Sequence, residues 1–128
     1  MIFGIGTDIV RVARMQQDLE RFGEPFAERI LTDNELTEFR SVTHHRAHFL
    51  AKRFAAKEEA VKALGTGFSQ GIHLREIGVG HDSFGKPLLE FSGRALEFVR
   101  VKGIAFSHVS LSDEADHAVA FVTLETAE

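Results

Sequence analysis

Residues 45–67 read HRAHFLAKRFAAKEEAVKALGTG and contain the longest helical signal in the chain. Apolar side chains recur there at the spacing of one helix face, at Leu50, Phe54, Val61 and Leu64. Gly65 is a natural helix stop, because glycine readily takes the left-handed conformation that ends many helices. The stretch therefore predicts a long helix from near His45 to Leu64.

One lysine stands out in this predicted helix. At 100° per residue, Lys57 falls inside the apolar stripe, whereas Glu58 and Lys62 fall on one shoulder and Arg53 on the other. A lysine on a buried face costs free energy unless it is paired or reaches water. In the ordinary interpretation, the side chain of Lys57 extends to water, and Glu58 and Lys62 form an exposed ion pair that stabilises the helix by roughly 0.3–0.5 kcal/mol. That interpretation explains Glu58 and Lys62 easily and Lys57 poorly, so a functional role stays open.

The segment IFGIGTD, Ile2 to Asp8, predicts a short strand with glycines at alternate positions, where another segment could approach the backbone closely. An amphipathic helix over 9–22 follows, so Asp8 is expected at the junction of strand and helix. Its ordinary role there is a helix N-cap. Its functional role would be an oxygen ligand for Mg²⁺, which proteins hold with one or two carboxylates plus phosphate oxygens and water.

The remaining segments predict short elements. We expect a short helix over 26–31, a second that runs from the capping box Thr32–Glu35 towards Arg40, and a third near 95–101. We expect strands over 72–80 and 87–91 around a turn, and a final hairpin of 104–112 with 118–124. This order predicts an α+β fold with a mainly antiparallel sheet packed by helices.

Composition narrows the possible functions. The chain has 128 residues, so residues 1–128 are expected to form a single domain. It has no cysteine, which excludes disulfides, thiolate catalysis and Cys-based zinc sites. The net charge of −4 argues against bulk attraction to nucleic acid or anionic lipid. No apolar run could span a bilayer and no basic leader opens the sequence, so a cytoplasmic protein is expected.

Two segments together resemble a known family. Gly6-Thr7-Asp8 and the run 54–62, FAAKEEAVK, are similar to the two signatures of the phosphopantetheinyl transferases. The whole chain resembles the short bacterial type, from GIGTDIV at the start to HVSLSDE near the end. Glu59 departs from the pattern, which usually has Ala or Ser there. We expect its side chain to face solvent and assign it no role.

The resemblance implies an activity and a metal site. Such an enzyme moves the phosphopantetheine arm of coenzyme A onto a serine of an acyl carrier protein, in support of fatty acid biosynthesis. Asp8 and Glu58 would bind Mg²⁺ together with the pyrophosphate of coenzyme A. Either Glu58 or a metal-bound water would act as base for the serine, and both alternatives stay open. Lys62 would neutralise or protonate the departing phosphate.

Further contacts to coenzyme A are implied at the end of the long helix and elsewhere. Gly65, Thr66 and Gly67 suit phosphate or ribose binding through their N–H groups, although a simple helix cap explains them equally well. The other residues expected to contact the coenzyme are Arg46, Arg53 and Lys57 at its 3′-phosphate, Pro87 in the family-like Gly85-Lys86-Pro87 turn, and His108 near the adenine.

The first predicted helix offers a surface for an acidic partner. Arginines cluster on one flank of its apolar face, interrupted by Asp18, and basic side chains around apolar ones suit docking of an acidic carrier helix. The residues expected to bind the partner are Arg11, Arg14, Met15, Arg21 and Phe22. An ordinary solvated helix face is the alternative, and without the family resemblance it would be preferred.

The resemblance also implies a homotrimer with active sites between subunits.

Two other functions fit parts of the sequence. His44 and His48 are spaced four residues apart, as in helical zinc motifs, but the glutamate of such a motif and a third ligand are missing. A stronger rival is a binding module that holds a nucleotide or coenzyme and docks a partner without catalysis. Binding alone would not require the carboxylates of Asp8 and Glu58 together with Lys62, so the enzyme is preferred.

Overall fold

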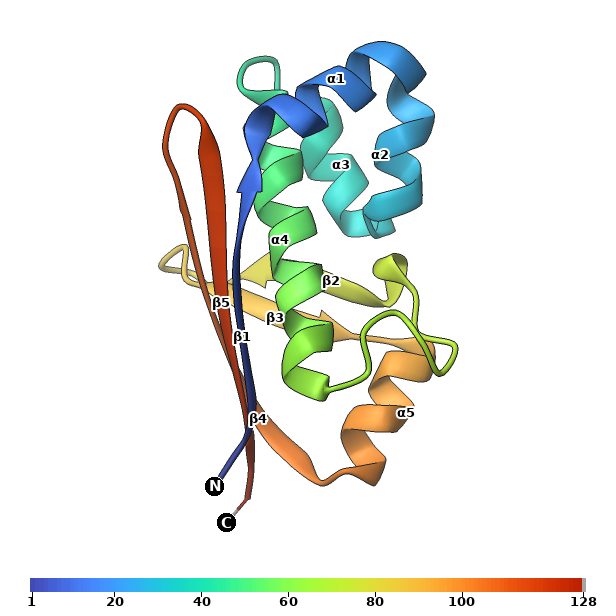
Figure 1. The fold of residues 1–128 in the computed structure, drawn as a ribbon, viewed down its shortest axis with the longest axis vertical. Coiled ribbons are helices and arrows are strands. Elements are labelled where there is room, and N and C mark those ends of the chain that lie inside the picture. The colour runs from blue at the N-terminus through green and yellow to red at the C-terminus, as the bar shows by residue number, and fades with distance from the viewer. Residues whose placement is uncertain (128) are drawn as a thin grey trace.

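The computed structural model describes residues 1–127 and contains two antiparallel sheets with helices against them (Figure 1). In the larger sheet, β5 (His117–Thr126) lies between β1 (Ile2–Arg11) and β4 (Ile104–Asp113). The smaller sheet pairs β2 (Ile77–His81) with β3 (Pro87–Phe91). The predicted α+β class with antiparallel strands is confirmed.

One long helix, α4 (Arg46–Leu64), runs beside the larger sheet and contacts both β1 and β5. Shorter helices gather around the start of α4, and another lies near its end (Figure 1). The first three are α1 (Val12–Phe22), α2 (Glu24–Ile30) and α3 (Asp33–Ser41). The 3₁₀ turn η1 (Leu74–Glu76) precedes β2, and α5 (Gly93–Val101) lies near the chain termini. Helix α4 is therefore the centre of the fold.

The two faces of the larger sheet differ in what covers them. Alternate residues of β5, from Ala118 to Leu124, are fully buried against α4. The opposite face carries exposed apolar side chains, including Ile5, Ile9 and Phe121. Isoleucine 5 and isoleucine 9 remain 58% and 61% exposed, so no part of residues 1–127 covers this outer face.

Two glycines let β1 approach α4 closely, as the alternate glycines predicted. A Cβ atom on Gly4 would lie 2.0 Å from the carbonyl oxygen of Ala63, and one on Gly6 would lie 2.2 Å from that of Glu59. Real Cβ atoms do not come so near to backbone oxygen, so only glycine fits at either position. The close approach fixes β1 against the last turns of α4.

The junction of β1 and α1 corrects one prediction. Strand β1 continues to Arg11, which pairs with His117 of β5. Helix α1 therefore begins at Val12 rather than at residue 9, and its N-cap is Arg11 with no side-chain cap. Asp8 lies inside the strand and is not a helix N-cap.

The other predicted elements need smaller changes. The capping box at the start of α3 is present with both of its hydrogen bonds, between Thr32 and Glu35. The predicted strand over 72–80 begins only at Ile77, because Ile77 pairs with Phe91, the last residue of β3, and the residues before Ile77 have no partner strand.

No helix within residues 1–127 is long and apolar enough to cross a bilayer.

Candidate active site

A charged cluster lies where β1 passes the last turns of α4. Residues at alternate positions of β1 share a face, so Asp8 lies on the same side as Gly4 and Gly6, towards α4. There Nζ of Lys62 donates a hydrogen bond to Oδ2 of Asp8 over 2.9 Å. Both side chains are about half exposed, at 52% for Asp8 and 47% for Lys62. The site is therefore open to solvent and to a ligand.

Two hydrogen bonds hold the Asp8 carboxylate. Besides Lys62 at Oδ2, the backbone N–H of Ile9 donates to Oδ1 over 2.7 Å. The bond from Lys62, with that from Ile9, keeps the pKa of Asp8 below its ordinary value. The same bond from Lys62 to Asp8 raises the pKa of the Lys62 ammonium. Asp8 is therefore a carboxylate, and Lys62 an ammonium, at neutral pH.

Glu58 joins this cluster from α4. Its side chain is half-buried, and this burial raises the pKa of its carboxyl group. The nearby charge of Asp8 raises the pKa further, whereas Arg14 and Lys62 lower it. The charge of Asp8 therefore acts on Glu58 across the β1–α4 contact, and a cation site shared by the two carboxylates stays a prediction.

Glu59 corrects a second prediction. Its side chain is fully buried rather than exposed to solvent, and its backbone carbonyl is the group that Gly6 approaches. Oε1 of Glu59 lies 3.2 Å from Nζ of Lys62 as an ion pair, but neither carboxylate oxygen accepts a hydrogen bond from residues 1–127. Burial raises the pKa of Glu59, against the lowering effect of Lys62. The closeness of β1 to the Glu59 backbone could have been suspected from the glycines, but the burial of the Glu59 side chain could not.

The donor set fits a divalent cation that is shared with a ligand. Asp8 and Glu58 provide hard carboxylate oxygens, and Mg²⁺ is usually bound by one or two carboxylates plus phosphate and water. The ammonium of Lys62 already occupies a cation position beside Asp8. Within residues 1–127 there is no group of three acidic or histidine side chains that could hold a metal alone.

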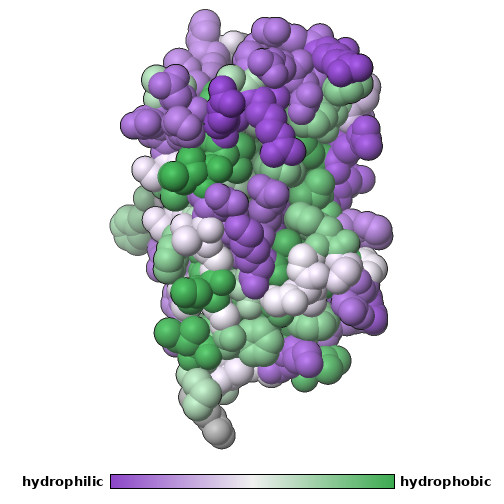
Figure 2. Space-filling model, in the orientation of Figure 1, coloured by the Kyte–Doolittle hydropathy of each residue, from purple (hydrophilic) through white to green (hydrophobic). Residues whose placement is uncertain are grey.

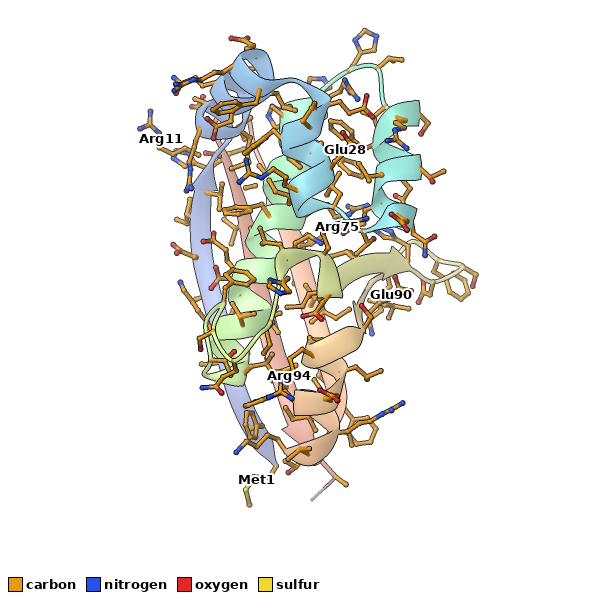
Figure 3. The ribbon with its side chains drawn as sticks, turned by 90° about the vertical axis from the view of Figure 1, so that its right-hand side faces the viewer. Met1, Arg11, Glu28, Arg75, Glu90 and Arg94 are labelled. Atoms are coloured by element: carbon orange, nitrogen blue, oxygen red, sulfur yellow. The ribbon has the colours of Figure 1, made fainter. Side chains whose placement is uncertain are left out.

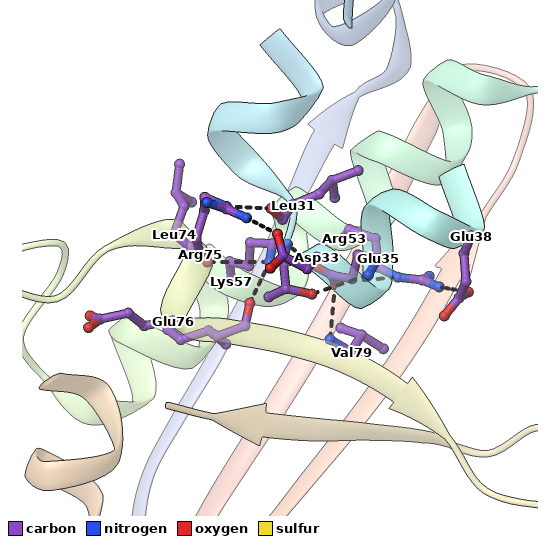
Figure 4. A network of polar contacts seen from close by, with 12 residues as sticks. Leu31, Asp33, Glu35, Glu38, Arg53, Lys57, Leu74, Arg75, Glu76 and Val79 are labelled. Atoms are coloured by element: carbon purple, nitrogen blue, oxygen red, sulfur yellow. Dashed lines mark hydrogen bonds and ion pairs between the residues drawn. The ribbon is translucent and has the colours of Figure 1, made fainter. Parts of the chain in front are cut away.

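Lys57 and Arg53 are not part of this cluster, which corrects their predicted phosphate contacts. Figure 4 shows them in a buried polar network between α4, α3 and β2. Nζ of Lys57 donates to Oε1 of Glu35 over 2.6 Å and to the carbonyl of Ile77, and it has no exposed surface. Arg53 donates to Glu38 over 3.0 Å and is 5% exposed. Neither cation can reach a phosphate unless this network opens.

The buried position of Lys57 resolves the puzzle of a lysine in an apolar stripe. Glu35 accepts from Lys57 and also from the backbone N–H groups of Thr32 and Val79. Burial lowers the pKa of Lys57, and Glu35 opposes that shift. The lysine is paired rather than extended to water, so its role in this structure is to join α4 to α3 and β2.

The segment Gly65-Thr66-Gly67 has the conformation of a helix cap. Gly65 and Gly67 have φ of 83° and 58°, which favour glycine. The N–H groups of all three residues donate to the carbonyl of Val61, at 3.1 to 3.2 Å. Those N–H groups are therefore occupied within the chain, and the helix-cap interpretation accounts for them here.

The other predicted coenzyme contacts lie apart from the cluster. Arg46 begins α4, roughly 24 Å along the helix axis from Lys62, with its guanidinium 4.0 Å from the ring centre of Phe39. Pro87 begins β3 in the smaller sheet. His108 lies in β4 opposite Thr123 of β5, so its side chain is on the outer face of the sheet, away from Asp8. There Nε2 of His108 lies 2.6 Å from Oε1 of Glu125. A single chain does not bring these three residues together with Asp8.

The histidines at the start of α4 do not form the predicted alternative metal site. His44 precedes the helix, which begins at Arg46, so the helical four-residue spacing to His48 does not apply. Nε2 of His48 instead contacts the backbone carbonyl of Ala115 over 3.1 Å. His45 and His48 line an open cavity of about 640 Å³ with Arg11, Arg46 and His117.

Helix α1 presents part of the predicted partner surface. Figure 2 shows hydrophilic side chains concentrated around the end of the molecule that carries α1. Arg11, at the base of the helix, projects away from the fold (Figure 3). Arg14 and Phe22, together with Phe26 and Arg29 of α2, line a groove of about 200 Å³. Met15 is only 1% exposed, so it supports the groove from below and is not itself a contact surface.

Comparison with known proteins gives a consistent family. A family model described as the 4′-phosphopantetheinyl transferase superfamily matches residues 4–122. The holo-[acyl-carrier-protein] synthase of Nitrosococcus oceani is 57% identical over 97% of this chain and 80% of its own length. The crystal structure of the Neisseria meningitidis holo-[acyl-carrier-protein] synthase superimposes with a TM-score of 0.92 at 44% identity, over 98% of this chain and 100% of that one. The Bacillus anthracis holo-(acyl-carrier-protein) synthase, solved in complex with CoA (3′,5′-ADP), gives a TM-score of 0.83 at 37% identity over 99% of both chains.

Proposed function

Because the chain belongs to the 4′-phosphopantetheinyl transferase superfamily, we propose that it transfers the 4′-phosphopantetheine group of coenzyme A to a serine of apo acyl carrier protein. The products are holo acyl carrier protein and 3′,5′-ADP. The observation that supports this proposal is the hydrogen bond between Lys62 and Asp8 at the β1–α4 contact, beside a half-buried Glu58 whose pKa the charge of Asp8 raises. Relatives that match over nearly the whole chain are named for this activity, and one of them was solved with the coenzyme.

The reaction requires stabilisation of the negative charge that develops at the diphosphate of coenzyme A. The serine oxygen forms a bond to the β-phosphorus of coenzyme A, and the bond from that phosphorus to the bridging oxygen of 3′,5′-ADP breaks. Negative charge develops on the bridging oxygen, so fixed cations stabilise the transition state more than the ground state. Bound Mg²⁺ would supply this stabilisation and align the diphosphate for in-line displacement. Asp8 and Glu58 are the residues that would hold it.

Glu58 and Lys62 have complementary tasks around the transferred group. The carboxylate of Glu58, whose pKa burial raises towards that of a useful base, would accept the serine proton directly or through a water. Lys62, which is half exposed beside Asp8, would neutralise the charge on the departing 3′,5′-ADP. Asp8 keeps a low pKa and therefore stays ionised throughout.

The carrier would approach along α1. Acyl carrier proteins are acidic, and Arg14 and Arg21 are exposed on this helix beside exposed Phe22, with exposed Arg11 at its N-cap. Arg14 also lowers the pKa of Glu58 through its charge, so the docking surface extends towards the reacting group. Charge pairing of this kind speeds encounter and fixes orientation.

We further propose a homotrimer whose active sites lie between subunits. The exposed apolar side chains on the outer face of the larger sheet, with Ile5, Ile9 and Phe121 among them, suit burial against another copy. His108 on that face would then lie between two copies, and a neighbouring copy would have to complete the coenzyme site around the Asp8 cluster. An assembled site would explain why one chain leaves His108 and Pro87 apart from that cluster.

The cellular setting of the proposal follows from its product. A carrier with a thiol-ended arm serves pathways that hold acyl groups as thioesters, and we propose fatty acid biosynthesis in the cytoplasm. Coenzyme A is a substrate, and Mg²⁺ is the proposed cofactor.

Incubation with coenzyme A, Mg²⁺ and apo acyl carrier protein tests the transfer directly. Intact-mass spectrometry of the carrier should show the added phosphopantetheine, and Glu58→Ala should abolish that gain while its circular dichroism stays that of a folded protein. A carrier that never gains mass, although calorimetry shows coenzyme A binding, would favour the binding module instead. Transfer by Glu58→Ala at the wild-type rate would refute the assignment of Glu58.

A further inference from the structure

Lys62 is shared between two carboxylates of different character. Its Nζ atom lies 2.9 Å from Oδ2 of Asp8 and 3.2 Å from Oε1 of Glu59. The Asp8 side chain is 52% exposed, whereas that of Glu59 has no exposed surface. One carboxylate can therefore exchange Lys62 for a ligand from solution, and the other cannot be reached by solvent at all.

Glu59 depends on Lys62 more than Asp8 does. Neither oxygen of Glu59 accepts a hydrogen bond from residues 1–127, so the ion pair with Lys62 is its main compensation for burial. A buried carboxylate without a partner costs several kcal/mol. Asp8, by contrast, is solvated and also accepts the backbone N–H of Ile9. Loss of Lys62 is therefore tolerable for Asp8 and unfavourable for Glu59.

A cation at Asp8 competes with Lys62. The hydrogen bonds from Ile9 and Lys62 occupy one oxygen each, and the ammonium of Lys62 repels a second positive charge nearby. Once a divalent cation takes Asp8, Lys62 must move off Oδ2. Glu59 then offers the partner that keeps the ammonium close to the cluster.

We propose that Glu59 is a positioning residue that withdraws Lys62 from Asp8 when a divalent cation binds, and that holds its ammonium at the site for the departing phosphate. This inference rests on the proposed function for its last step, but its first step concerns cation binding alone. Glu59 thereby acts through Lys62 and not as a ligand. It gives a role to a carboxylate at a position where the family pattern usually has a small residue.

A double-mutant cycle on Mn²⁺ affinity tests the first step. The full chain is titrated with Mn²⁺ alone, without coenzyme A or carrier, and free Mn²⁺ is followed by electron paramagnetic resonance. The variants are Glu59→Gln, Lys62→Met and the double variant. Glu97→Gln serves as the charge-matched control, because its carboxylate pairs with Arg94 at an exposed position on α5.

The expected pattern is a coupling between the two positions. Lys62→Met should tighten Mn²⁺ binding roughly fivefold by removing the competitor, and Glu59→Gln should weaken it roughly fivefold, the lower end of ordinary couplings between sites. In the Lys62→Met background, Glu59→Gln should change the affinity by only about twofold or less, as for the Glu97→Gln control. Equal weakening in both backgrounds would make Glu59 a direct ligand and overturn the proposal, as would no weakening in either.

The second step has its own readout. In transfer assays at saturating Mg²⁺, Glu59→Gln should lower kcat for transfer with little change in KM for coenzyme A, because the ammonium acts on the departing group. A raised KM with unchanged kcat would contradict this step. If the wild-type chain transfers nothing, the proposed function fails, whereas the Mn²⁺ cycle still decides the coupling of Glu59 and Lys62.

Discussion

Nζ of Lys62 and Oδ2 of Asp8 lie 2.9 Å apart although the two residues are 54 positions apart in the chain. This contact joins the centre of an edge strand to the last turns of the central helix. It exists because glycines at positions 4 and 6 let the strand backbone approach the helix backbone. The chemistry of the site therefore depends on residues that have no side chain.

Replacement of Asp8 by Asn should remove a cation ligand and leave the fold intact, because the side chain is half exposed. We expect kcat/KM for phosphopantetheine transfer to fall by about 100-fold or more, as for other groups that stabilise developing charge. Steady-state kinetics with a mass-spectrometric readout measures this loss. Asp33→Asn, at a 94% exposed position, is the control and should stay near wild-type. A small loss that excess Mg²⁺ fully restores would show that Asp8 only strengthens metal binding.

Replacement of Gly6 by Ala should damage both stability and activity. The new Cβ would lie 2.2 Å from the carbonyl oxygen of Glu59, so strand and helix must separate. We expect a loss of about 1–3 kcal/mol in the free energy of unfolding, typical of overpacked interiors, measured by urea denaturation. Gly80→Ala is the matched control, because its Cβ would meet only the side chain of Glu90. Equal losses in the two variants would contradict a special requirement at Gly6.

The titration of Glu58 should respond to Arg14. Burial raises the pKa of Glu58 above the ordinary value of 4.5, and the positive charge of Arg14 counteracts this. Arg14→Gln should therefore raise that pKa further, as ¹³C NMR titration of the side-chain carboxyl in metal-free protein can measure. Arg21→Gln is the control, because Arg21 is not among the charges that act on Glu58.

The raised pKa of Glu58 also determines the direction in which the free energy of unfolding changes with pH. A carboxyl whose pKa is higher in the folded state holds its proton more tightly there, so unfolding releases protons. The contribution of Glu58 therefore becomes less favourable as pH rises from 4.5 through the raised pKa. Glu58→Gln should remove this part of the pH dependence. An unchanged pH profile of the unfolding free energy would contradict the raised pKa.

The buried pair of Lys57 and Glu35 should be costly to break from one side. Lys57→Met removes the nearer of the two cations at the buried Glu35 carboxylate and leaves only Arg53, 3.5 Å away, so we expect a loss of about 3 kcal/mol in the free energy of unfolding. The double variant Lys57→Met with Glu35→Gln should lose less than the sum of the single changes, since no buried charge is left unpaired. Additive losses in urea denaturation would show that the two side chains do not act as a pair.

The α1 surface should affect binding of the carrier rather than chemistry. Arg21→Glu introduces a charge that repels an acidic partner, and we expect KM for the carrier to rise about tenfold at low salt while kcat is unchanged. Added salt should reduce the difference, because the charges are exposed. Arg100→Glu on α5 is the control for charge alone. A loss confined to kcat would place Arg21 at the reacting group instead.

Much of the fold followed from local pattern. The apolar stripe and Gly65 predicted α4 to within one residue at its start, and Thr32 with Glu35 predicted the cap of α3. Periodicity did not show where β1 ends, because the pairing of Arg11 with His117 of β5 extends the strand beyond Asp8. Strand length was set by the partner strand, which no local pattern contains.

For the candidate site too, the sequence predicted some features and missed others. Asp8, Glu58 and Lys62 were predicted together from their chemistry and from the family motifs. The structure joins Asp8 to Lys62 by a hydrogen bond, whereas the place of Glu58 in the site stays a prediction. Glu59 was expected in solvent, and Lys57 and Arg53 at a phosphate. A helix wheel gives the direction of a side chain but not what lies there, so it could not show that Glu59 is buried or that Glu35 pairs with Lys57.

The order of apolar, charged and glycine residues along the chain was sufficient to determine which helices and strands form and which side chains could carry phosphoryl chemistry. Only the tertiary structure decided which of those charges became buried partners and which stayed free for a ligand. The physical reason is that burial and ion pairing depend on distances between segments far apart in the chain. Here those distances are set by the packing of β1, α3 and β2 against α4.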